Sequence, residues 1–589
     1  MSLTVSDPVR PYAQQPCLGM RRLLVLGLLV LGLLSLRLVH LGADTPVLIT
    51  LPDDVGLYVD EGYKTLDPRN LVLFGTASWH PADDYPGWIG RSPLTQWSYY
   101  AAFRLAAPDL ESARAVTIVY FGLFLLGYIW AMRARLSWPV LVGGLLAFGL
   151  ESTLFFYTRA ALFEIPLITF LYGLLFYFAR MDERRLLLPL VLTAACGAFL
   201  AIAIKMSAVF YVIPIGLAVL IHLLLQTRSG LYRRLVRSVV LGITLVVLIL
   251  FVATYDWIDA VFIQVNVDQS SHTFSIVGAL YRALTMPLMR ASPFVVVVGL
   301  ACLAHGLATR PDHYLGNLYR LTLICIVLLA PIIVAVFPYN PLRYYLPALP
   351  AYLLLVLEWF HLQTWRADGS ARVPPVRRIC VIALLAMAVF SALFPIYRLF
   401  SDALPEALGS RTDIVKYLLL PAAVALGALI WRLRGTLFQR RVLMYGGISM
   451  LLAFTLYNAY GIMSFLIAPT YHLQAVREQV TRIVGAEATL AGDWAPIAAL
   501  GTPVHALYMN RRYNPVANID ALRPDYFFYG DSPESRRSLA ELQRTPGVRV
   551  AAPIDVGTYY NGRRRVVLYP LYYDVPTVRP APRGITTTP

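Results

Sequence analysis

Predominantly apolar runs of about 20 residues recur along this chain, and they constrain its fold more than any other feature. This is the length that an α-helix needs to cross the hydrocarbon core of a bilayer. The pattern predicts an α-helical protein that crosses the membrane about thirteen times. The predicted spans are residues 20–41, 115–132, 138–157, 163–180, 186–204, 207–226, 238–255, 291–308, 320–337, 345–361, 379–395, 414–431 and 443–468.

Composition and charge support a membrane protein and exclude two other classes. Of the 589 residues, 58% are hydrophobic and only 14% are charged, whereas soluble proteins are about one quarter charged. Intrinsic disorder is excluded because the apolar content is high. The net charge of +16 could indicate a nucleic-acid partner, but the cations fall in short loops between apolar runs. There they signal topology, so no nucleic-acid partner is predicted.

The loop cations also predict the orientation. Arg21 and Arg22 precede the first span, and the other arginine-rich loops fall on the same side of the membrane. The positive-inside rule makes that side cytosolic. An odd number of spans then places the C-terminus outside, which for a bacterial inner membrane is the periplasm. A cleaved signal peptide is the alternative for residues 20–41, but the run is long and no clear small-x-small cleavage site follows.

Two segments on the outer side are large, and together they define the predicted domains. Residues 1–468 are predicted to form the membrane domain. It includes a first outer loop, 43–114, whose tryptophans and tyrosines favour helices in the membrane interface. Residues 469–589 are predicted to form a small external α/β domain. Its expected helices are 474–484 and 533–544, and its expected strands are 488–491, 526–529, 548–551 and 565–568.

The first outer loop carries the adjacent carboxylates Asp60 and Glu61. Two neighbouring carboxylates repel each other, and burial raises their pKa. One of them could then act as a general base at the membrane surface. The alternative is a solvated acidic turn without a catalytic role. The position of the pair, soon after the first span, favours the catalytic interpretation.

Other ionisable groups lie at the outer ends of predicted spans, where burying a charge is costly and marks a functional site. They are Arg159, Glu164, Lys205 and Arg343. The three cations could hold a phosphate, which arginine can engage bidentately. The alternatives are snorkelling of Arg159 to lipid headgroups and a structural ion pair between Arg159 and Glu164. Because all four groups share the outer side, we expect a single cavity.

The order of these motifs resembles the membrane glycosyltransferases of the GT-C fold. The similarity is to the branch that contains protein O-mannosyltransferases and the lipid A aminoarabinose transferase. Four segments carry the resemblance. They are Asp60-Glu61-Gly62-Tyr63 with Arg69-Asn70-Leu71, Ser92-Pro93-Leu94 followed by Trp97, Arg159 with Glu164, and Arg343-Tyr344-Tyr345-Leu346-Pro347. Ser92 replaces the usual proline of the family, and Glu164 replaces its commoner aspartate.

The resemblance implies a polyprenyl-phosphate sugar donor, usually undecaprenyl phosphate, and transfer with inversion at the anomeric carbon. Asp60 would take the proton of the acceptor hydroxyl, Glu61 would orient the acceptor or tune that base, and Glu164 would contact the sugar or acceptor. Lys205 and Arg343 would stabilise the departing lipid phosphate, with Arg159 as a third cation. The acceptor would be a glycan, lipid A or a protein hydroxyl. Further predicted substrate contacts are Tyr63, Lys64, Asp84, Tyr345 and His272.

A metal and a different function class remain as alternatives. Asp83 and Asp84 could attract a divalent cation, but the spacing supplies no third or fourth ligand, so no metal is predicted. His80 could face substrate or be an ordinary interfacial residue. A secondary transporter or lipid flippase would also explain many spans, although two matching halves are not seen. A polysaccharide polymerase or ligase would share the lipid-linked donor without requiring the acidic pair.

Overall fold

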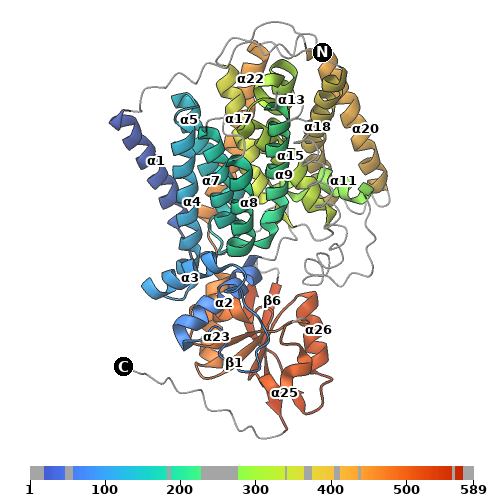
Figure 1. The fold of residues 1–589 in the computed structure, drawn as a ribbon. Coiled ribbons are helices and arrows are strands. Elements are labelled where there is room, and N and C mark those ends of the chain that lie inside the picture. The colour runs from blue at the N-terminus through green and yellow to red at the C-terminus, as the bar shows by residue number, and fades with distance from the viewer. Residues whose placement is uncertain are drawn as a thin grey trace.

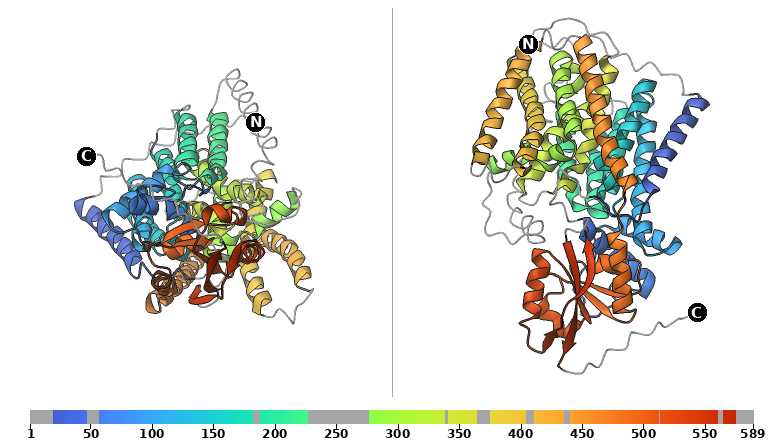
Figure 2. Two further views of the ribbon diagram at one scale, coloured as in Figure 1. Left: turned by 90° about the horizontal axis from the view of Figure 1, so that it is seen from below. Right: turned by 180° about the vertical axis from the view of Figure 1, so that it is seen from behind.

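The computed structural model places a helical membrane part above a small sheet domain (Figure 1). The helices run roughly parallel, and the two views of Figure 2 show the sheet domain against one end of them. The residues that the structure describes are 19–46, 57–181, 188–226, 276–337, 341–363, 375–403, 411–434, 440–511, 513–559 and 564–574.

The membrane part contains long helices joined by short helical turns. The first half comprises α1 (Met20–Leu38), α4 (Leu110–Met132), α5 (Trp138–Leu150), α6 (Ser152–Tyr157), α7 (Glu164–Arg180), α8 (Leu188–Phe199), the π-helical turn η1 (Leu200–Ile204), the 3₁₀ turn η2 (Met206–Ala208) and α9 (Val209–Gln226). The second half comprises α11 (Ile276–Leu284), α12 (Pro287–Ala291), α13 (Pro293–Thr309), α14 (Pro311–Leu315), α15 (Leu318–Val336), α16 (Leu342–Tyr345), the 3₁₀ turn η3 (Leu346–Ala348), α17 (Leu349–Gln363), α18 (Pro375–Ala403), α20 (Arg411–Arg432) and α22 (Arg440–Ile467).

A multi-pass helical membrane protein is confirmed, although not every predicted span is one continuous helix. Within the described residues, five helical segments are long and apolar enough to cross a bilayer, namely 110–132, 206–225, 318–336, 342–362 and 449–484. The last of these runs beyond α22 into α23 (His472–Val484). Further apolar helices of 10–17 residues accompany them. The predicted span 238–255 lies outside the described residues.

The predicted span 138–157 is interrupted at Glu151, which separates α5 from α6. Glu151 has an extended backbone, and its carboxylate accepts hydrogen bonds from Leu154 N (2.7 Å) and Ser292 Oγ (2.7 Å). The carboxylate therefore caps α6 and ties it to the start of α13. A hydropathy pattern does not register such a break, because the residues on both sides remain apolar.

Two helices of the first outer loop lie between the membrane part and the sheet domain (Figures 1 and 2). These are α2 (Leu57–Phe74) and α3 (Pro93–Leu105). Pro93 begins α3 at a position where a missing N–H costs nothing. The side chains of Trp97 and Leu105 are 53% and 88% exposed, as expected for a helix whose outer side meets the membrane interface.

The C-terminal domain is a six-stranded mixed sheet with helices, so the predicted α/β domain is confirmed. Its strand order is β2-β1-β3-β6-β4, with β5 also paired to β6. β1 pairs in parallel with β2 and β3, whereas β6 is antiparallel to β3, β4 and β5. The elements are α23, β1 (Thr489–Gly492), α24 (Ala495–Ala499), β2 (His505–Tyr508), the 3₁₀ turn η4 (Val516–Asn518), α25 (Ile519–Leu522), β3 (Tyr526–Gly530), α26 (Pro533–Leu542), β4 (Val548–Val550), β5 (Ile554–Tyr559) and β6 (Arg564–Tyr573). The sequence did not predict β2, β5, α24 and α25, of which three are only four or five residues long.

The sheet domain packs closely against α2. Gly62 approaches α24 so tightly that an added Cβ would lie 2.4 Å from Ile497 N. Arg69 is fully buried, and its guanidinium donates to the carbonyl oxygens of Thr502 (2.9 Å) and Val504 (2.5 Å) at the start of β2. The first outer loop and the C-terminal domain therefore form one continuous packed unit.

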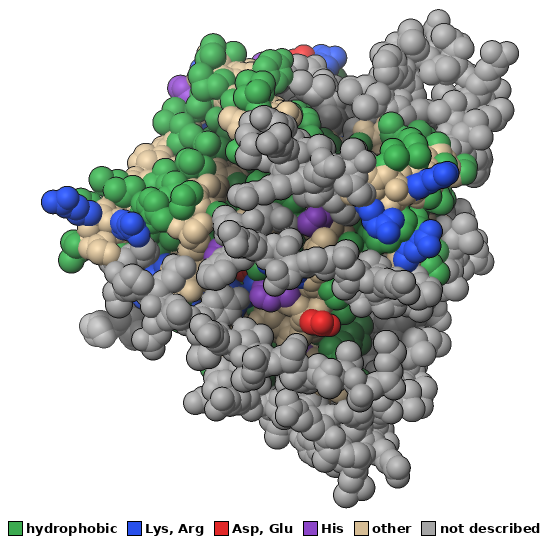
Figure 3. Space-filling view, turned by 90° about the horizontal axis from the view of Figure 1, so that it is seen from above, with side chains coloured by type: hydrophobic (Ala, Val, Ile, Leu, Met, Phe, Trp, Pro, Cys, Tyr) green, Lys and Arg blue, Asp and Glu red, His purple; other side chains and the backbone are tan. Residues whose placement is uncertain are grey.

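The end of the molecule opposite the sheet domain carries the positive charge that the topology argument uses. Figure 3 looks onto this end, where Lys and Arg side chains stand at both sides of apolar surface and histidines lie nearer the middle. Lys and Arg side chains are thus present at the end of the helices that lies away from the sheet domain.

Asp493, directly after β1, makes the stability of the C-terminal domain depend on pH. Its buried carboxylate accepts hydrogen bonds from Ser532 Oγ (3.0 Å) and Ser535 Oγ. Burial raises the pKa of this carboxyl from 3.8 to about 7. Between these values the folded state holds a proton that the unfolded chain releases, so the free energy of unfolding falls as pH rises from about 4 to about 7.

We expect thermal unfolding of the full-length protein in detergent to start at a lower temperature at pH 8 than at pH 5. Asn at this position keeps the shape without titrating, so Asp493→Asn should reduce this difference. Tryptophan fluorescence would follow the transition, because Trp494 packs beside Asp493 in the same domain. An equal pH difference in both proteins would contradict the assignment to Asp493.

Candidate functional site

Asp60 and Glu61 lie side by side in the first turn of α2, but they point in different directions. Successive residues of an α-helix are rotated by about 100°, and both side chains are buried, at 4% and 0% exposure. Asp60 Oδ1 accepts a hydrogen bond from the hydroxyl of Tyr63 at 2.6 Å. Asp60 Oδ2 forms an ion pair with Arg343 and lies 3.7 Å from Lys64 Nζ. The acidic pair is thus buried and is not a solvated turn.

Glu61 is held on the other side of α2 by Arg114, the fifth residue of α4. Arg114 Nε and Nη2 each donate to a Glu61 oxygen at 2.9 Å, which makes a bidentate pair. Glu61 Oε1 also accepts from Ala161 N at 2.7 Å. Arg114 Nη1 donates to the carbonyls of Leu41 (2.8 Å) and Ala43 (2.6 Å). This network ties together four segments of the chain, and it occupies both oxygens of Glu61.

Glu164 and Lys205 form a second carboxylate–cation pair of the site. Glu164 is the first residue of α7, where the helix dipole stabilises a negative charge. Lys205 has an extended backbone between η1 and η2, and this break in the helix places its ammonium group against Glu164 Oε1 in a buried ion pair. Arg343 Nε lies 4.0 Å from the same oxygen. Arg343 therefore bridges the carboxylates of Asp60 and Glu164.

Five charged side chains thus form one buried group, which we call the ion cluster. It consists of Asp60, Lys64, Glu164, Lys205 and Arg343, and each is at most 8% exposed. Three are cationic and two are anionic, so one positive charge is in excess. Burial lowers the pKa of Lys64 to about 8, with the carboxylate of Glu164 acting in the opposite direction. Lys64 therefore remains mostly protonated at neutral pH, and the ion cluster suits an anionic ligand.

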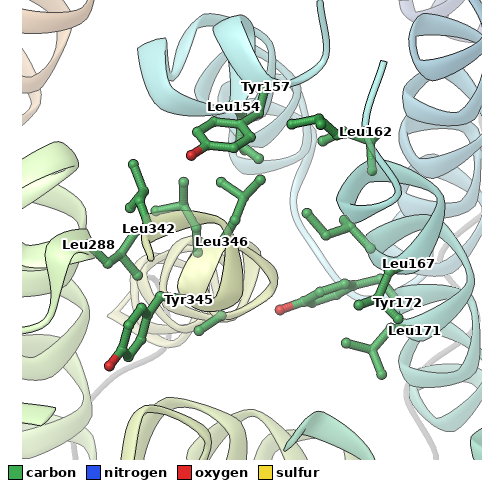
Figure 4. Packing of buried hydrophobic residues seen from close by; sticks show 14 of the residues in the cluster. Leu154, Tyr157, Leu162, Leu167, Leu171, Tyr172, Leu288, Leu342, Tyr345 and Leu346 are labelled. Atoms are coloured by element: carbon green, nitrogen blue, oxygen red, sulfur yellow. The ribbon is translucent and has the colours of Figure 1, made fainter. Parts of the chain in front are cut away.

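The side chain of Tyr344, rather than that of Tyr345, faces the ion cluster. The Lys205 ammonium lies 5.0 Å from the centre of the Tyr344 ring, and the Arg343 guanidinium carbon lies 5.7 Å from it. Such cation–π contacts help to hold the two cations in place. Tyr345 is fully buried in the hydrophobic core near Leu288 and Leu342 (Figure 4). The structure therefore does not bring Tyr345 to the ion cluster.

Arg159 also lies apart from the ion cluster. Its guanidinium donates to the carbonyl oxygens of Val39 and His40, each at 2.6 Å, and to that of Arg37. These carbonyls belong to the last turn of α1 and to the two residues that follow the helix, where unpaired acceptors need donors. The Arg159 guanidinium carbon also lies 4.5 Å from the centre of the Phe465 ring. Arg159 therefore caps the C-terminal end of α1 and packs it against α22. In this position it does not lie beside Arg343, where it was predicted to bind an anion.

The other predicted contacts hold the outer loop in place or lie outside the described residues. Asp84 accepts from Asn514 N, and Asp83 Oδ1 accepts from Asn514 Nδ2 at 2.7 Å, so both link the loop to the C-terminal domain. His80 Nδ1 accepts from Ala82 N at 3.1 Å within its own turn. Across the part of the chain that the structure describes, no group of three His, Cys, Asp or Glu side chains is arranged to hold a metal. His272 lies outside that part.

Comparison with known proteins gives a likeness in fold. The sequence matches no protein family model and no curated protein. The chain is similar to solved structures of ArnT from Cupriavidus metallidurans, one bound to undecaprenyl phosphate and one in the apo state. Each match has 15% sequence identity and covers 93% of this chain and 98% of that chain, with TM-scores of 0.45 and 0.47 respectively.

Sequence reasoning missed two residues of this region, Arg114 and Tyr344. Arg114 directly precedes the predicted span 115–132, so a cation at the outer end of a span was a usable signal. Tyr344 lies next to Arg343, but a short helical turn decides which of two neighbouring tyrosines faces the ion cluster. That choice depends on the rotation of α16 and is not visible in the sequence.

Proposed function

We propose that this protein is a membrane glycosyltransferase that moves a single sugar from a polyprenyl phosphate to a hydroxyl of an acceptor on the outer side of the membrane. The observation that carries the proposal is the ion cluster. It combines a carboxylate that can act as a base with an excess of buried cations that can hold a phosphate. Isolated buried charges without a ligand are costly, so the arrangement favours a bound anion as its working state.

The chemistry follows from the positions of the charges. The acceptor oxygen attacks the anomeric carbon, its proton passes to Asp60, and the bond from that carbon to the phosphate oxygen breaks. The departing lipid phosphate changes from a singly charged diester to a monoester that can carry two negative charges. Lys205, Arg343 and Lys64 face this growing charge, and such preorganised cations stabilise it in the transition state. A phosphate bound to Arg343 would also release Asp60 from its ion pair.

The acceptor and the membrane location are parts of the same proposal. The acceptor is a glycan, lipid A or a protein hydroxyl, approaching beside the C-terminal domain. The positive end shown in Figure 3 would face the cytosol by the positive-inside rule. The ion cluster and the sheet domain would then lie on the periplasmic side of a bacterial inner membrane.

Binding of the lipid phosphate tests the assignment of the cations. We expect Lys205→Met and Arg343→Met each to weaken the binding of undecaprenyl phosphate by about tenfold or more, since each removes a charge-assisted contact. The affinity would be measured in detergent with purified protein. Arg310→Met is a matched control, because Arg310 follows the distal end of α13 and donates to Leu362 O. Equal affinities in all four proteins would contradict the assignment.

Transfer itself tests the proposed function. Purified protein in liposomes should move labelled sugar from a polyprenyl-phosphate donor to an acceptor, with release of polyprenyl phosphate. A lipid carrier would move the intact donor across the bilayer without consuming it. Transport of the donor without release of polyprenyl phosphate would therefore favour the carrier and exclude our proposal.

A further inference from the structure

Helix α3 carries a row of four polar side chains that are fully buried. Ser92, Thr95, Gln96 and Tyr99 each have 0% exposure. Their spacing of three, four and seven residues places them on one face of the helix, counting Ser92 as its cap. We call this row the α3 polar face. Most buried helix faces are apolar, so a buried polar row requires an explanation.

Each residue of the α3 polar face has an atom without a hydrogen-bond partner among the described residues. These atoms are Ser92 Oγ, Thr95 Oγ1, Gln96 Oε1 and Tyr99 OH. Buried polar atoms in folded proteins are almost always paired. Ser98, which lies on another side of α3, follows that rule, because its hydroxyl donates to Leu94 O (2.9 Å) and bonds to Tyr120 OH (2.7 Å). The unpaired atoms are therefore a property of one face and not of the whole helix.

The α3 polar face borders the ion cluster. Gln96 Nε2 donates to Lys64 O at 2.7 Å. The Tyr99 ring stacks on Phe163 with a centroid distance of 6.4 Å, and the Lys64 ammonium lies 5.2 Å from the centre of that same ring. Phe163 directly precedes Glu164, whose Oε2 is likewise unpaired. In addition, α3 packs against η1, the turn that leads into Lys205. The α3 polar face therefore lies close enough to the cations for both to contact the same ligand.

The chemistry of the α3 polar face is neutral, in contrast to that of the ion cluster. Its three hydroxyl groups can each donate and accept a hydrogen bond, and the amide oxygen of Gln96 accepts one. Burial raises the pKa of the Tyr99 hydroxyl, so it stays protonated and able to donate. A phosphate offers acceptors and charge, which the cations already match. Sugar hydroxyl and amino groups can both donate and accept, and they match neutral partners.

We infer that the α3 polar face binds the hydroxyl or amino groups of the sugar carried by the lipid phosphate, and so selects the sugar-loaded lipid over the bare lipid. This inference rests on the proposed function, and it assigns the sugar to a defined set of side chains. Gln96 Oε1 requires a hydrogen-bond donor, which the hydroxyl or amino groups of the sugar supply. The same contacts would discriminate between sugars, because a binding site rejects analogues that leave its buried polar groups unpaired.

The test uses the double variant Thr95→Val/Tyr99→Phe, which removes two hydroxyl groups with little change in shape. The probes are bare undecaprenyl phosphate and undecaprenyl phosphate carrying glucose, mannose, arabinose or 4-amino-4-deoxyarabinose. We expect the wild-type protein to bind at least one loaded lipid more tightly than the bare lipid. The double variant should lose about tenfold in affinity for that loaded lipid, with its affinity for the bare lipid unchanged.

Two controls separate a binding role from a structural one. Ser98→Ala removes a hydroxyl of the same helix that already has partners, so it should leave the preference for the loaded lipid intact. The hydroxyls of Thr95 and Tyr99 bond to no described residue. In the absence of the loaded lipid, the double variant and the wild type should therefore have the same melting temperature. A lower melting temperature together with equal losses for loaded and bare lipid would assign these hydroxyls to structure and overturn the inference.

The remaining outcomes distinguish this inference from the proposed function. A wild-type protein that binds no undecaprenyl phosphate at all would refute the proposed function itself. A wild-type protein that binds the bare lipid but prefers none of the loaded lipids would overturn the inference and leave the phosphate site standing. A double variant that keeps the full wild-type preference for the loaded lipid would likewise overturn the inference and leave the phosphate site standing.

Discussion

Asp60→Asn is expected to lower the rate of sugar transfer by about 10²- to 10⁴-fold, the usual contribution of a general base. Asparagine has nearly the same shape but cannot take the proton of the acceptor hydroxyl. The cations Lys205, Arg343 and Lys64 remain in place, so undecaprenyl phosphate should still bind. Initial rates of transfer in liposomes, together with lipid affinity in detergent, would measure the two effects separately.

A matched control is Asp520→Asn, which changes an exposed aspartate of α25 in the same way and should leave transfer unchanged. If Asp60→Asn kept more than about a tenth of the wild-type rate, its loss would fall below the range for a general base. The molecule that receives the sugar would then need no base to remove its proton, as expected if its attacking oxygen is already ionised. In that case the Asp60 carboxylate would serve to position Arg343.

The largest loss of stability is expected from Arg114→Met. This change removes one partner of a fully buried bidentate ion pair and leaves the carboxylate of Glu61 without its cation, which typically costs about 3–5 kcal/mol. It also removes the donors for the carbonyls of Leu41 and Ala43. We expect a clear drop in the melting temperature and in the yield of folded protein in detergent.

The double variant Glu61→Gln/Arg114→Met separates the charge from the packing. Without the carboxylate, no buried charge is left unpaired, so the double variant should be more stable than Arg114→Met alone. Arg104→Met is the control for loss of an arginine, because Arg104 is exposed on α3. A melting temperature for Arg114→Met equal to that of the wild type would show that the pair does not hold α2 to α4.

This network favours the second of the two roles that the sequence resemblance implies for Glu61, which is to tune Asp60. Its carboxylate is occupied by Arg114 and by Ala161 N, whereas Asp60 faces Lys64 and Arg343. We therefore treat Glu61 as a positioning residue that sets the rotation of α2, and thereby the direction of Asp60. The partner that defines this role lies 53 residues away in the sequence, so no local pattern around Glu61 could reveal it.

Most of the ion cluster was predictable from ionisable residues close to apolar segments, where a charge has to find a partner. Glu164, Lys205 and Arg343 lie at the ends of predicted spans, and Asp60 belongs to the acidic pair of the first outer loop. The structure places these four together with Lys64, which was predicted as a substrate contact and lies one helical turn from Asp60. Arg159 also lies close to apolar segments but caps α1 instead. A charged residue at the end of an apolar segment thus indicates that its side chain has a bonding partner in the fold, but it does not indicate which residue or ligand that partner is.

Hydropathy and charge along the chain were enough to predict the membrane character, the approximate positions of the helices and the presence of a C-terminal α/β domain. These features follow from hydrophobic length and from the distribution of charge along the chain, which are local properties. Three features could be seen only in the folded protein: Glu61 turns away from Asp60, Tyr344 rather than Tyr345 faces the ion cluster, and α3 directs four polar side chains inward. Those outcomes depend on the rotation of each helix and on breaks such as the one at Lys205, and packing between distant segments sets both.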